Sequence, residues 1–255
     1  MTVSDNVGDV ALAQRLAANT IFGDLDYRSI LLDGLKLAEG LDVLDVACGN
    51  GAFTLDFKRA VGSGRATGVD SSAELVEAAR RSCDEVKLEV SFLICDAAEL
   101  PFANASFDRI CCSYAVYHFP EIDIALDEMF RVLRPGGRLV LTGPTMTNNL
   151  ELYELHRLGG GTISRAMGRD LFETAIGSYL KRSQATTEFV EYQNNILFPS
   201  KAALLDNYAA TKLFLDNVQE AERPGFLARL GQMDWPPVLQ PLTVTKTIGV
   251  FLVSA

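Results

Sequence analysis

The sequence predicts an α/β protein in which helices cover both faces of a largely parallel sheet. Five short apolar segments alternate with helical segments between residues 43 and 142, which is the pattern of repeated βαβ units. A Gly-x-Gly turn, Gly49–Gly51, joins the first apolar segment directly to a helix. The chain has 255 residues, 48% of them hydrophobic, which is enough for one large core. We therefore expect a single domain over residues 1–255.

The elements of the first half follow from apolar runs and helix-boundary signals. Residues 1–36 have helical spacing and precede a core at residues 41–143. Strands are expected at Val43–Ala47, Ala66–Val69, Val90–Cys95, Arg109–Ser113 and Arg138–Thr142. Helices are expected at Ala52–Val61, from Ser71 to about Cys83, and at Ile122–Leu133. Ser71 is the expected N-cap because Glu74 follows three residues later, and Arg134–Gly137 should end the third helix and form a turn.

Beyond Gly143 strands and helices no longer alternate. Helical segments are expected at Leu150–Leu158, Leu171–Leu180 and Ser200–Leu215, with a strand within residues 187–198. We interpret residues 148–240 as a helical cap on the substrate side, which contributes that one strand to the sheet. Residues 244–254 form the last strand.

Composition excludes several classes of function. The 23 Lys and Arg against 33 Asp and Glu give a net charge of −10, which argues against binding nucleic acid. No apolar run is long enough to span a membrane, and the N-terminus MTVSDNVGDV has acids where a signal peptide is basic. Five cysteines without C-x-x-C spacing indicate reduced thiols, with no disulfide framework and no metal site. We expect a cytoplasmic protein.

The glycine turn and the acids around it indicate a cofactor that carries positive charge. Asp70 ends the second strand, where an acid accepts hydrogen bonds from ribose hydroxyls. A dinucleotide fingerprint would need a third glycine at position 54, which is Thr54 here. Asp45, four residues before Gly49, would repel a pyrophosphate but suits an amino group or a sulfonium. The residues thus favour a cationic adenosine cofactor over NAD or FAD, with a ligand-free tight turn as the alternative.

Five motifs give the segment from Leu41 to Thr142 a family resemblance. They are VLDVACGNG (43–51), GVDSS (68–72), CDAAELPF (95–102), SFDRI (106–110) and RVLRPGGRLVL (131–141). In this order and at this spacing they resemble the class I S-adenosylmethionine-dependent methyltransferases, in their broad small-molecule branch. The resemblance implies a Rossmann-like sheet of seven strands with the last one antiparallel. It also implies S-adenosyl-L-methionine as the cofactor and S-adenosyl-L-homocysteine as the product.

The resemblance carries over a set of cofactor-binding positions. They are Asp45, Ala47, Cys48, Gly49, Gly51, Asp70, Ser71, Asp96, Ala97 and Ser113. The glycine turn would hold the methionine part through backbone groups, with Asp45 near its amino group. Asp70 would accept from the ribose hydroxyls, and Asp96 and Ala97 would bind the adenine. Ser113, after the fourth strand, would close over the methionine part. For each acid, the alternative is an ordinary surface or cap residue.

The catalytic candidate is His118, in a loop after the fourth strand that faces the transferred methyl in this family. It would act as a base or contact the acceptor, and the alternative is a structural or pocket-lining role. Candidates for the substrate pocket are Tyr114, Tyr117, His118, Tyr153 and His156, the last with a solvated helix position as its alternative. Tyr27 and Arg28 lie where some members hold the cofactor's carboxylate.

The expected function is methyl transfer to an O, N or C atom of a small molecule. Apolar and aromatic residues of the cap suggest an apolar or aromatic acceptor, unless they form the cap's own core: Tyr153, Leu155, Ile163, Phe172, Tyr179, Tyr208, Phe214 and Trp235. The alternative keeps the fold and cofactor but performs cyclisation or another alkyl transfer, or binds the ligand without turnover. The expected state is a monomer or homodimer, with neither nucleic acid nor membrane as a partner.

Overall fold

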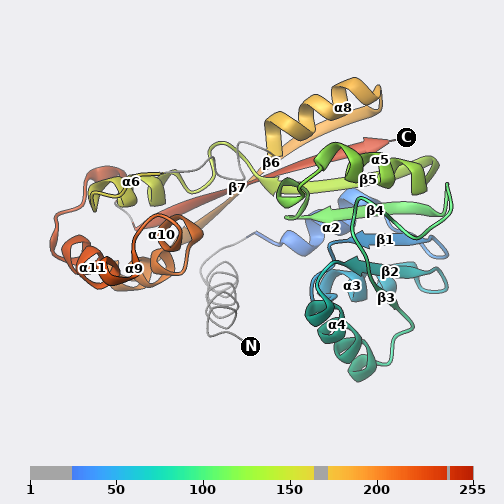
Figure 1. Cartoon of the computed structure of the whole chain (residues 1–255), viewed down its shortest axis with the longest axis horizontal. Coiled ribbons are helices and arrows are strands. Elements are labelled where there is room, and N and C mark those ends of the chain that lie inside the picture. The colour runs from blue at the N-terminus through green and yellow to red at the C-terminus, as the bar shows by residue number, and fades with distance from the viewer. Residues whose placement is uncertain (1–24, 164–171, 240–241, 255) are drawn as a thin grey trace. The chain divides into compact units, whose positions relative to one another are not determined.

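The computed structural model describes residues 25–163, 172–239 and 242–254. It divides into two compact units (Figure 1). The first, which we call the sheet unit, comprises residues 26–145, 168–191 and 249–255. The second, the helical unit, comprises residues 1–25, 146–167 and 192–248. The expected cap at 148–240 therefore contributes to both units, and the expected helix within residues 10–21 lies outside the described residues.

Seven strands form one sheet in the order β3-β2-β1-β4-β5-β7-β6. Their bounds are β1 Val43–Val46, β2 Ala66–Asp70, β3 Ser91–Ile94, β4 Phe107–Ser113, β5 Leu133–Pro144, β6 Thr186–Leu197 and β7 Thr243–Ser254. The strands β1 to β5 pair in parallel, and the last strand is antiparallel. The predicted Rossmann-like sheet is confirmed.

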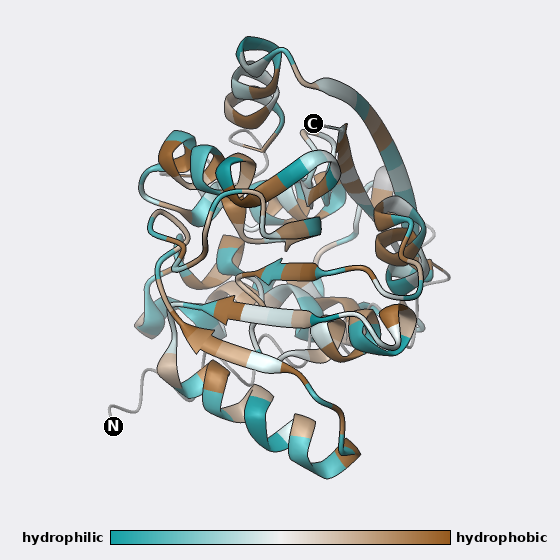
Figure 2. Ribbon diagram, turned by 90° about the vertical axis from the view of Figure 1, so that its right-hand side faces the viewer, coloured by the Kyte–Doolittle hydropathy of each residue, from teal (hydrophilic) through white to brown (hydrophobic). Residues whose placement is uncertain are grey.

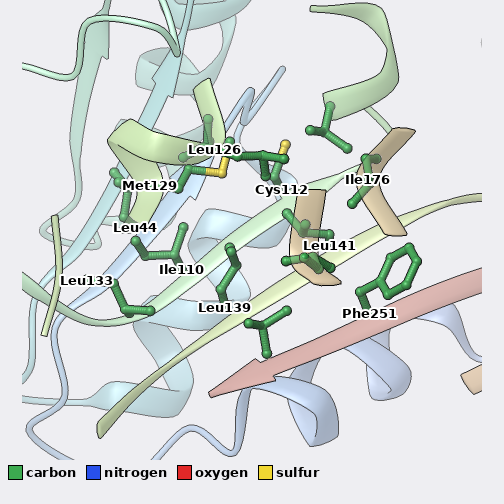
Figure 3. Close-up of a cluster of buried hydrophobic side chains, with 14 of the residues drawn as sticks. Leu44, Ile110, Cys112, Leu126, Met129, Leu133, Leu139, Leu141, Ile176 and Phe251 are labelled. Carbon is green, nitrogen blue, oxygen red and sulfur yellow. The ribbon is translucent and has the colours of Figure 1, made fainter. Parts of the chain in front are cut away.

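Helices cover both faces of the sheet within the sheet unit. They are α2 Tyr27–Leu35, α3 Ala52–Val61, α4 Ala73–Val86, η1 Val116–His118, α5 Ile122–Val132, η2 Phe172–Ile176 and α8 Gly177–Ser183. Alternate strand residues such as Leu44, Ile110 and Leu141 pack against Leu126 and Met129 of α5 (Figure 3). Most of these helices carry hydrophilic and hydrophobic residues on different sides, as Figure 2 shows by hydropathy. This burial on both faces explains why the strands read as continuous apolar runs.

Two predicted boundaries in the sheet unit are wrong. The N-cap of α4 is Ser72, not Ser71, because the Asp70 side chain accepts from the Ser72 backbone N–H (2.9 Å) and shifts the helix start by one residue. The strand β5 begins at Leu133, which already pairs with Phe107. The predicted turn at Arg134–Gly137 is a register shift inside the strand, and regular pairing resumes at Arg138.

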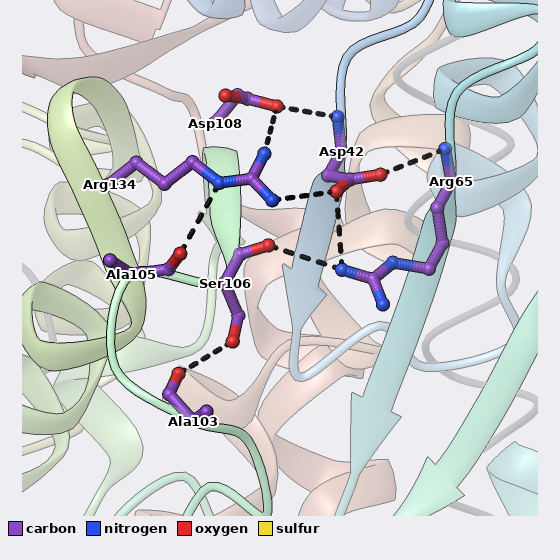
Figure 4. A network of polar contacts seen from close by, with 7 residues as sticks. All are labelled: Asp42, Arg65, Ala103, Ala105, Ser106, Asp108 and Arg134. Atoms are coloured by element: carbon purple, nitrogen blue, oxygen red, sulfur yellow. Dashed lines mark hydrogen bonds and ion pairs between the residues drawn. The ribbon is translucent and has the colours of Figure 1, made fainter.

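Charged residues join the amino ends of four strands (Figure 4). Asp42 precedes β1 and Arg65 precedes β2, while Asp108 lies in β4 and Arg134 in β5. Arg134 contacts Asp108 through Nη1 (2.6 Å) and Asp42 through Nη2 (3.0 Å), and Arg65 Nη2 reaches Asp42 at 3.3 Å. The Asp42 backbone N–H donates to Asp108 (2.9 Å). We call these four residues the strand-start clamp.

The helical unit has its own apolar core. Its helices are α6 Leu150–Leu158, α9 Lys201–Ala209, α10 Lys212–Leu215, η3 Glu220–Glu222, α11 Arg223–Gln232 and η4 Pro237–Leu239. The predicted helix Ser200–Leu215 is broken in two, because the Thr211 side chain caps α10 by accepting from the Phe214 N–H (3.2 Å). No helix in the described ranges is long and apolar enough to cross a membrane.

Candidate functional site

The predicted cofactor residues of the sheet unit gather at one edge of the sheet. Because neighbouring parallel strands end on the same side, β1, β2, β3 and β4 bring their last residues to this edge. Val46 of β1 pairs with Val69 on one side and Cys112 on the other. Asp70 and Ser113 are the last residues of β2 and β4, and the glycine turn and Asp96 follow β1 and β3. The edge lies opposite the strand-start clamp.

The turn after β1 has a left-handed backbone at three positions. The φ angles are 58° at Ala47, 56° at Gly49 and 76° at Gly51. A Cβ on Gly51 would lie 2.8 Å from the Phe92 ring, so packing and conformation both require glycine there. A Cβ on Gly49 would meet no atom within 4 Å, so this part of the backbone is open to a ligand. The left-handed conformation of Ala47 costs about 1 kcal/mol, and residues with such strained backbones cluster at functional turns.

Asp70 ties the end of β2 to the glycine turn. Its Oδ2 accepts from the Gly49 backbone N–H (2.9 Å) and its Oδ1 from the Ser72 N–H (2.9 Å). Ser71, which lies between Asp70 and Ser72 in the sequence, is exposed. Each carboxylate oxygen has a second lone pair, so Asp70 can still accept from hydroxyl groups. Cys48 makes a second link, since its N–H donates to the Val69 carbonyl oxygen (2.9 Å).

Asp45 lies beneath this turn, almost fully buried. The Thr54 hydroxyl of α3 donates to its Oδ2 at 2.6 Å, and Thr54 is also fully buried. Burial raises the pKa of Asp45 to about 7; the Thr54 hydrogen bond opposes the rise and the nearby charge of Asp70 adds to it. Thr54 occupies the position of the third glycine in a dinucleotide fingerprint, and no sequence motif predicts its hydrogen bond to Asp45.

The residues after β3 form the outer part of the edge. Asp96 is exposed and accepts from the Ala98 backbone N–H through Oδ1 (2.9 Å), which shapes the loop. Ala97 is half-buried against the core. The Cys95 N–H donates to the Asp70 carbonyl oxygen (3.1 Å), so this loop is fixed to the end of β2.

A cluster of hydroxyl groups lies at the ends of β4 and β5. Ser113 pairs in register with Thr142, and the Tyr27 hydroxyl of α2 contacts both side chains, Ser113 Oγ at 2.6 Å and Thr142 Oγ1 at 2.5 Å. The Tyr27 ring meets Phe53 and Tyr114 edge-on, each at 5.6 Å between centroids. Thr142 is a site residue that the sequence reasoning missed, although it ends the predicted fifth strand.

The other candidates separate into distinct environments. His118 is exposed at the end of η1, with its ring centroid 4.4 Å from that of the buried Tyr117. Tyr117 also contacts Phe172 (6.2 Å), so its ring is part of the sheet unit's core. Arg28 Nε is paired with Asp56 Oδ2 (2.8 Å), which directs this cation to α3.

Tyr153 and His156 belong to the helical unit. Tyr153 is half-buried against that unit's core. His156 is 1% exposed, with Nδ1 2.6 Å from the Tyr208 hydroxyl and Nε2 3.2 Å from the Thr162 carbonyl oxygen. Because a carbonyl only accepts, Nε2 carries the proton and Nδ1 accepts from Tyr208 in the neutral ring. The alternative of a solvated helix position is wrong for His156.

The strand order, the glycine turn and the acids at the ends of β2 and β3 are the features expected of one class of protein. In these features the sheet unit resembles the class I S-adenosylmethionine-dependent methyltransferases. Residues 43–137 match the family described as Methyltransferase domain.

Similar curated proteins match about half of this chain. The demethylmenaquinone methyltransferase of Lactococcus lactis subsp. lactis (strain IL1403) is 38% identical over 122 residues, 46% of this chain and 48% of that protein. The demethylmenaquinone methyltransferase of Staphylococcus aureus (strain MRSA252) is 34% identical over 134 residues, 51% of this chain and 55% of that protein. The matched segment spans about half the length of these relatives.

Similarity at the level of the fold extends further along the chain. A Bacillus halodurans C-125 protein of known structure aligns over 90% of this chain and 99% of its own, with a TM-score of 0.64 and 17% identity. At this identity, the alignment describes the fold.

Proposed function

We propose that this protein binds S-adenosylmethionine at the carboxyl edge of its sheet and transfers the methyl group to a small molecule. One observation carries the proposal: Asp70 holds the Gly49 N–H, and the Cβ side of Gly49 is open. This arrangement places a carboxylate with spare acceptor capacity beside accessible backbone, which suits a ribose and a methionine chain. The motif match over residues 43–137 supports the same assignment.

The residues at this edge fit a cationic cofactor. Asp45 would lie under the amino group, Asp70 would accept from the ribose hydroxyls, and Asp96 and Ala97 would border the adenine. When bound, the cofactor supplies an electrophilic methyl on its sulfonium, so the protein's task is to align the acceptor and exclude water. His118, exposed after β4, is the candidate base for an acceptor that must lose a proton.

We propose an aromatic ring compound as the acceptor. The name of the two curated relatives, demethylmenaquinone methyltransferase, supports this class, and the match spans about half of their length. The aromatic residues of the cap give it no support, because Tyr208, Phe214 and Trp235 form the helical unit's core and Phe172 and Tyr179 the sheet unit's core. The monomeric or homodimeric state and the cytoplasmic location stay predictions of the sequence.

Calorimetric titration tests the cofactor assignment. We expect micromolar binding of S-adenosylmethionine and S-adenosylhomocysteine and no binding of NAD. Asp70→Ala should weaken binding by roughly 1–3 kcal/mol, since it removes a charged acceptor from the ribose hydroxyls. Asp84→Ala, at an exposed position of α4, is the matched control and should leave affinity unchanged. Wild-type affinity in Asp70→Ala would contradict the site.

Product analysis tests the reaction. The protein is incubated with S-adenosylmethionine and a panel of demethylated quinones, phenols and amines, and the products are identified by mass spectrometry. Methyl transfer releases S-adenosylhomocysteine together with an acceptor that is heavier by one methylene. Methylthioadenosine would instead indicate another alkyl transfer. Binding without turnover across the panel would favour a ligand-binding protein.

A further inference from the structure

The helical unit contains a cavity that the proposed methyl transfer does not use. Its volume is about 570 Å³, and its wall is formed by the turn 160–162 after α6 and by residues within 217–229, which run through η3 into α11. All of these residues belong to the helical unit, whereas the residues of the proposed cofactor site belong to the sheet unit. We call this cavity the α11 cavity.

One face of α11 supplies part of the wall. Four wall residues lie at positions i, i+3, i+4 and i+7, so they follow one another along the same side of the helix: Glu222, Gly225, Phe226 and Arg229. The backbone of Glu222 already has helical φ and ψ angles, so the helical spacing includes it. Gly225 leaves the middle of this face without a side chain. The face therefore carries a carboxylate near one end and a guanidinium near the other.

Arg229 is the cation of this wall. Its Nη2 donates to the Gly159 carbonyl oxygen (3.3 Å), and its guanidinium carbon lies 5.5 Å from the centroid of the Phe226 ring. In the part of the chain that the structure describes, Arg229 makes no ion pair, whereas Arg157 of the same unit is paired with Glu154 (2.6 Å). A guanidinium has five N–H donors, so Arg229 can still bind a carboxylate group.

Glu222 is the anion of the same wall. It is exposed, and among the described residues it pairs neither with Arg229 nor with Arg223, whose guanidinium donates to the carbonyl oxygens of Leu215 (2.8 Å) and Val218 (3.1 Å). Seven residues of helix separate the Cα atoms of Glu222 and Arg229 by about 10 Å. Side chains of this length can both reach a ligand that lies between them.

The turn 160–162 gives the cavity a second wall, made of backbone. A Cβ on Gly161 would lie 2.3 Å from His156 Nε2, and the same nitrogen lies 3.2 Å from the Thr162 carbonyl oxygen, so the His156 ring sets the path of the turn. A Cβ on Gly160 would meet no atom within 4 Å. The backbone at Gly160 is therefore accessible, and the turn is already held in place before a ligand binds.

We propose that the α11 cavity binds a zwitterionic small molecule of the amino-acid class, with its carboxylate at Arg229 and its ammonium group at Glu222. A guanidinium binds a carboxylate through two parallel hydrogen bonds, and an ammonium group donates to a carboxylate. Glu222 and the net charge of −10 repel a simple anion, and Arg229 repels a simple cation. The side-chain amide of Gln219, another wall residue, can contact either charged group. This ligand is separate from the cofactor and acceptor of the proposed function.

Calorimetric titration of the full chain with the standard L-amino acids tests the proposal. The amino acid that binds most tightly is then compared with its analogue without the amino group and its analogue without the carboxylate. We expect each singly charged analogue to bind at least about tenfold more weakly, because it loses one charge-assisted contact. Absence of binding by every amino acid at millimolar concentration would overturn the inference.

Two substitutions at exposed positions, each removing one charge, locate the ligand. Arg229→Gln should weaken binding of the amino acid about tenfold and leave the analogue without a carboxylate unchanged. Glu222→Gln should also weaken binding of the amino acid, but leave the analogue without an amino group unchanged. Arg157→Gln is the matched control, since it removes an arginine of α6 whose side chain is 73% exposed and lies outside the wall, and it should leave binding unchanged.

Titrations with and without saturating S-adenosylhomocysteine separate the two sites, because the cofactor itself contains an amino-acid group. Binding in the α11 cavity should persist in its presence. Binding that S-adenosylhomocysteine blocks, and that Arg229→Gln and Glu222→Gln leave intact, would place the amino acid at the glycine turn and overturn the inference while the proposed function stands. A wild-type protein that binds amino acids as expected but not S-adenosylmethionine would contradict the proposed function alone.

Discussion

The burial of Asp45 makes the ionised form of its carboxyl group energetically unfavourable. Asp45 is 2% exposed, and among the described residues Thr54 is the one side chain that donates to it. The pKa of about 7 in the folded chain lies above the ordinary value of 3.8. Between these pH values the folded chain holds a proton that the unfolded chain has lost. The stability of the fold therefore falls as pH rises from about 4 to 7, and levels off above.

Asp45→Asn should remove this dependence. The amide oxygen can still accept from Thr54, and the variant carries no titrating group at this position. The variant should gain unfolding free energy relative to wild type as pH rises through this window, by on the order of 3 kcal/mol. Urea unfolding of the ligand-free proteins at pH 5, 6, 7 and 8 measures the gain.

Asp84→Asn on α4 provides the control for Asp45→Asn. Asp84 is exposed, so the difference in unfolding free energy between Asp84→Asn and wild type should not vary with pH in this range. If the difference in unfolding free energy between Asp45→Asn and wild type were equally independent of pH, burial would not hold the proton on Asp45.

At the scale of elements, the strand-start clamp acts on the edge of the sheet opposite the site. Burial alone would raise the pKa of Asp108, but the Asp42 N–H and the Arg134 guanidinium hold it below its ordinary value. A lowered carboxyl pKa stabilises the fold above the unfolded pKa, and the contribution is lost as pH falls through the folded one. The clamp thus fixes the strand starts at neutral pH and releases them in acid.

Asp108→Asn should lower the free energy of unfolding by about 1 kcal/mol at pH 7, because Arg134 loses its charged partner. The loss should shrink as pH falls below the unfolded pKa of Asp108 and disappear below its lower folded pKa. Asp123→Asn is the matched control: its pair with Arg182 is exposed on both sides, so the change should stay within about 0.5 kcal/mol. Urea unfolding at pH 7 and pH 3 separates the two. Equal losses for both variants would show that the clamp contributes no more than a surface ion pair.

Local signals made the elements of residues 43–142 predictable. Apolar runs and the Gly49–Gly51 turn mark the strands and helices to within a few residues. The Ser72 cap was missed because Glu74, three residues after Ser71, favours Ser71 as the cap, and only the contact of Ser72 with Asp70 decides otherwise. The cluster of hydroxyl groups at the ends of β4 and β5 could not be predicted at all, since it joins Tyr27 to residues 86 and 115 positions away.

For the whole molecule, the second half of the chain was the harder one to predict. Its aromatic residues fit a pocket wall as well as a core, because both require apolar side chains. The structure assigns Tyr208 and Trp235 to a core that the helical unit builds for itself. Its last long helix, α11, was missed, since Pro224 near its start reads as a helix breaker as readily as a first-turn residue. The described chain forms two compact units, and the single domain with a cap stays a prediction of the sequence.

His156 gives the helical unit a pH dependence opposite to that of Asp45. Burial lowers the pKa of His156, so the unfolded chain binds a proton more readily and stability falls as pH drops below about 6.5.

Trp235, the one tryptophan of the chain, is buried in this unit, so its fluorescence reports the unfolding of the helical unit. We expect His156→Gln to destabilise the protein more at pH 7.5 than at pH 5, because only the wild type loses stability in acid at this position. His118→Gln, at the exposed histidine of η1, is the matched control for the loss of an imidazole. A loss in His156→Gln that is equal at both pH values would mean that the ring is not held neutral between Tyr208 and Thr162.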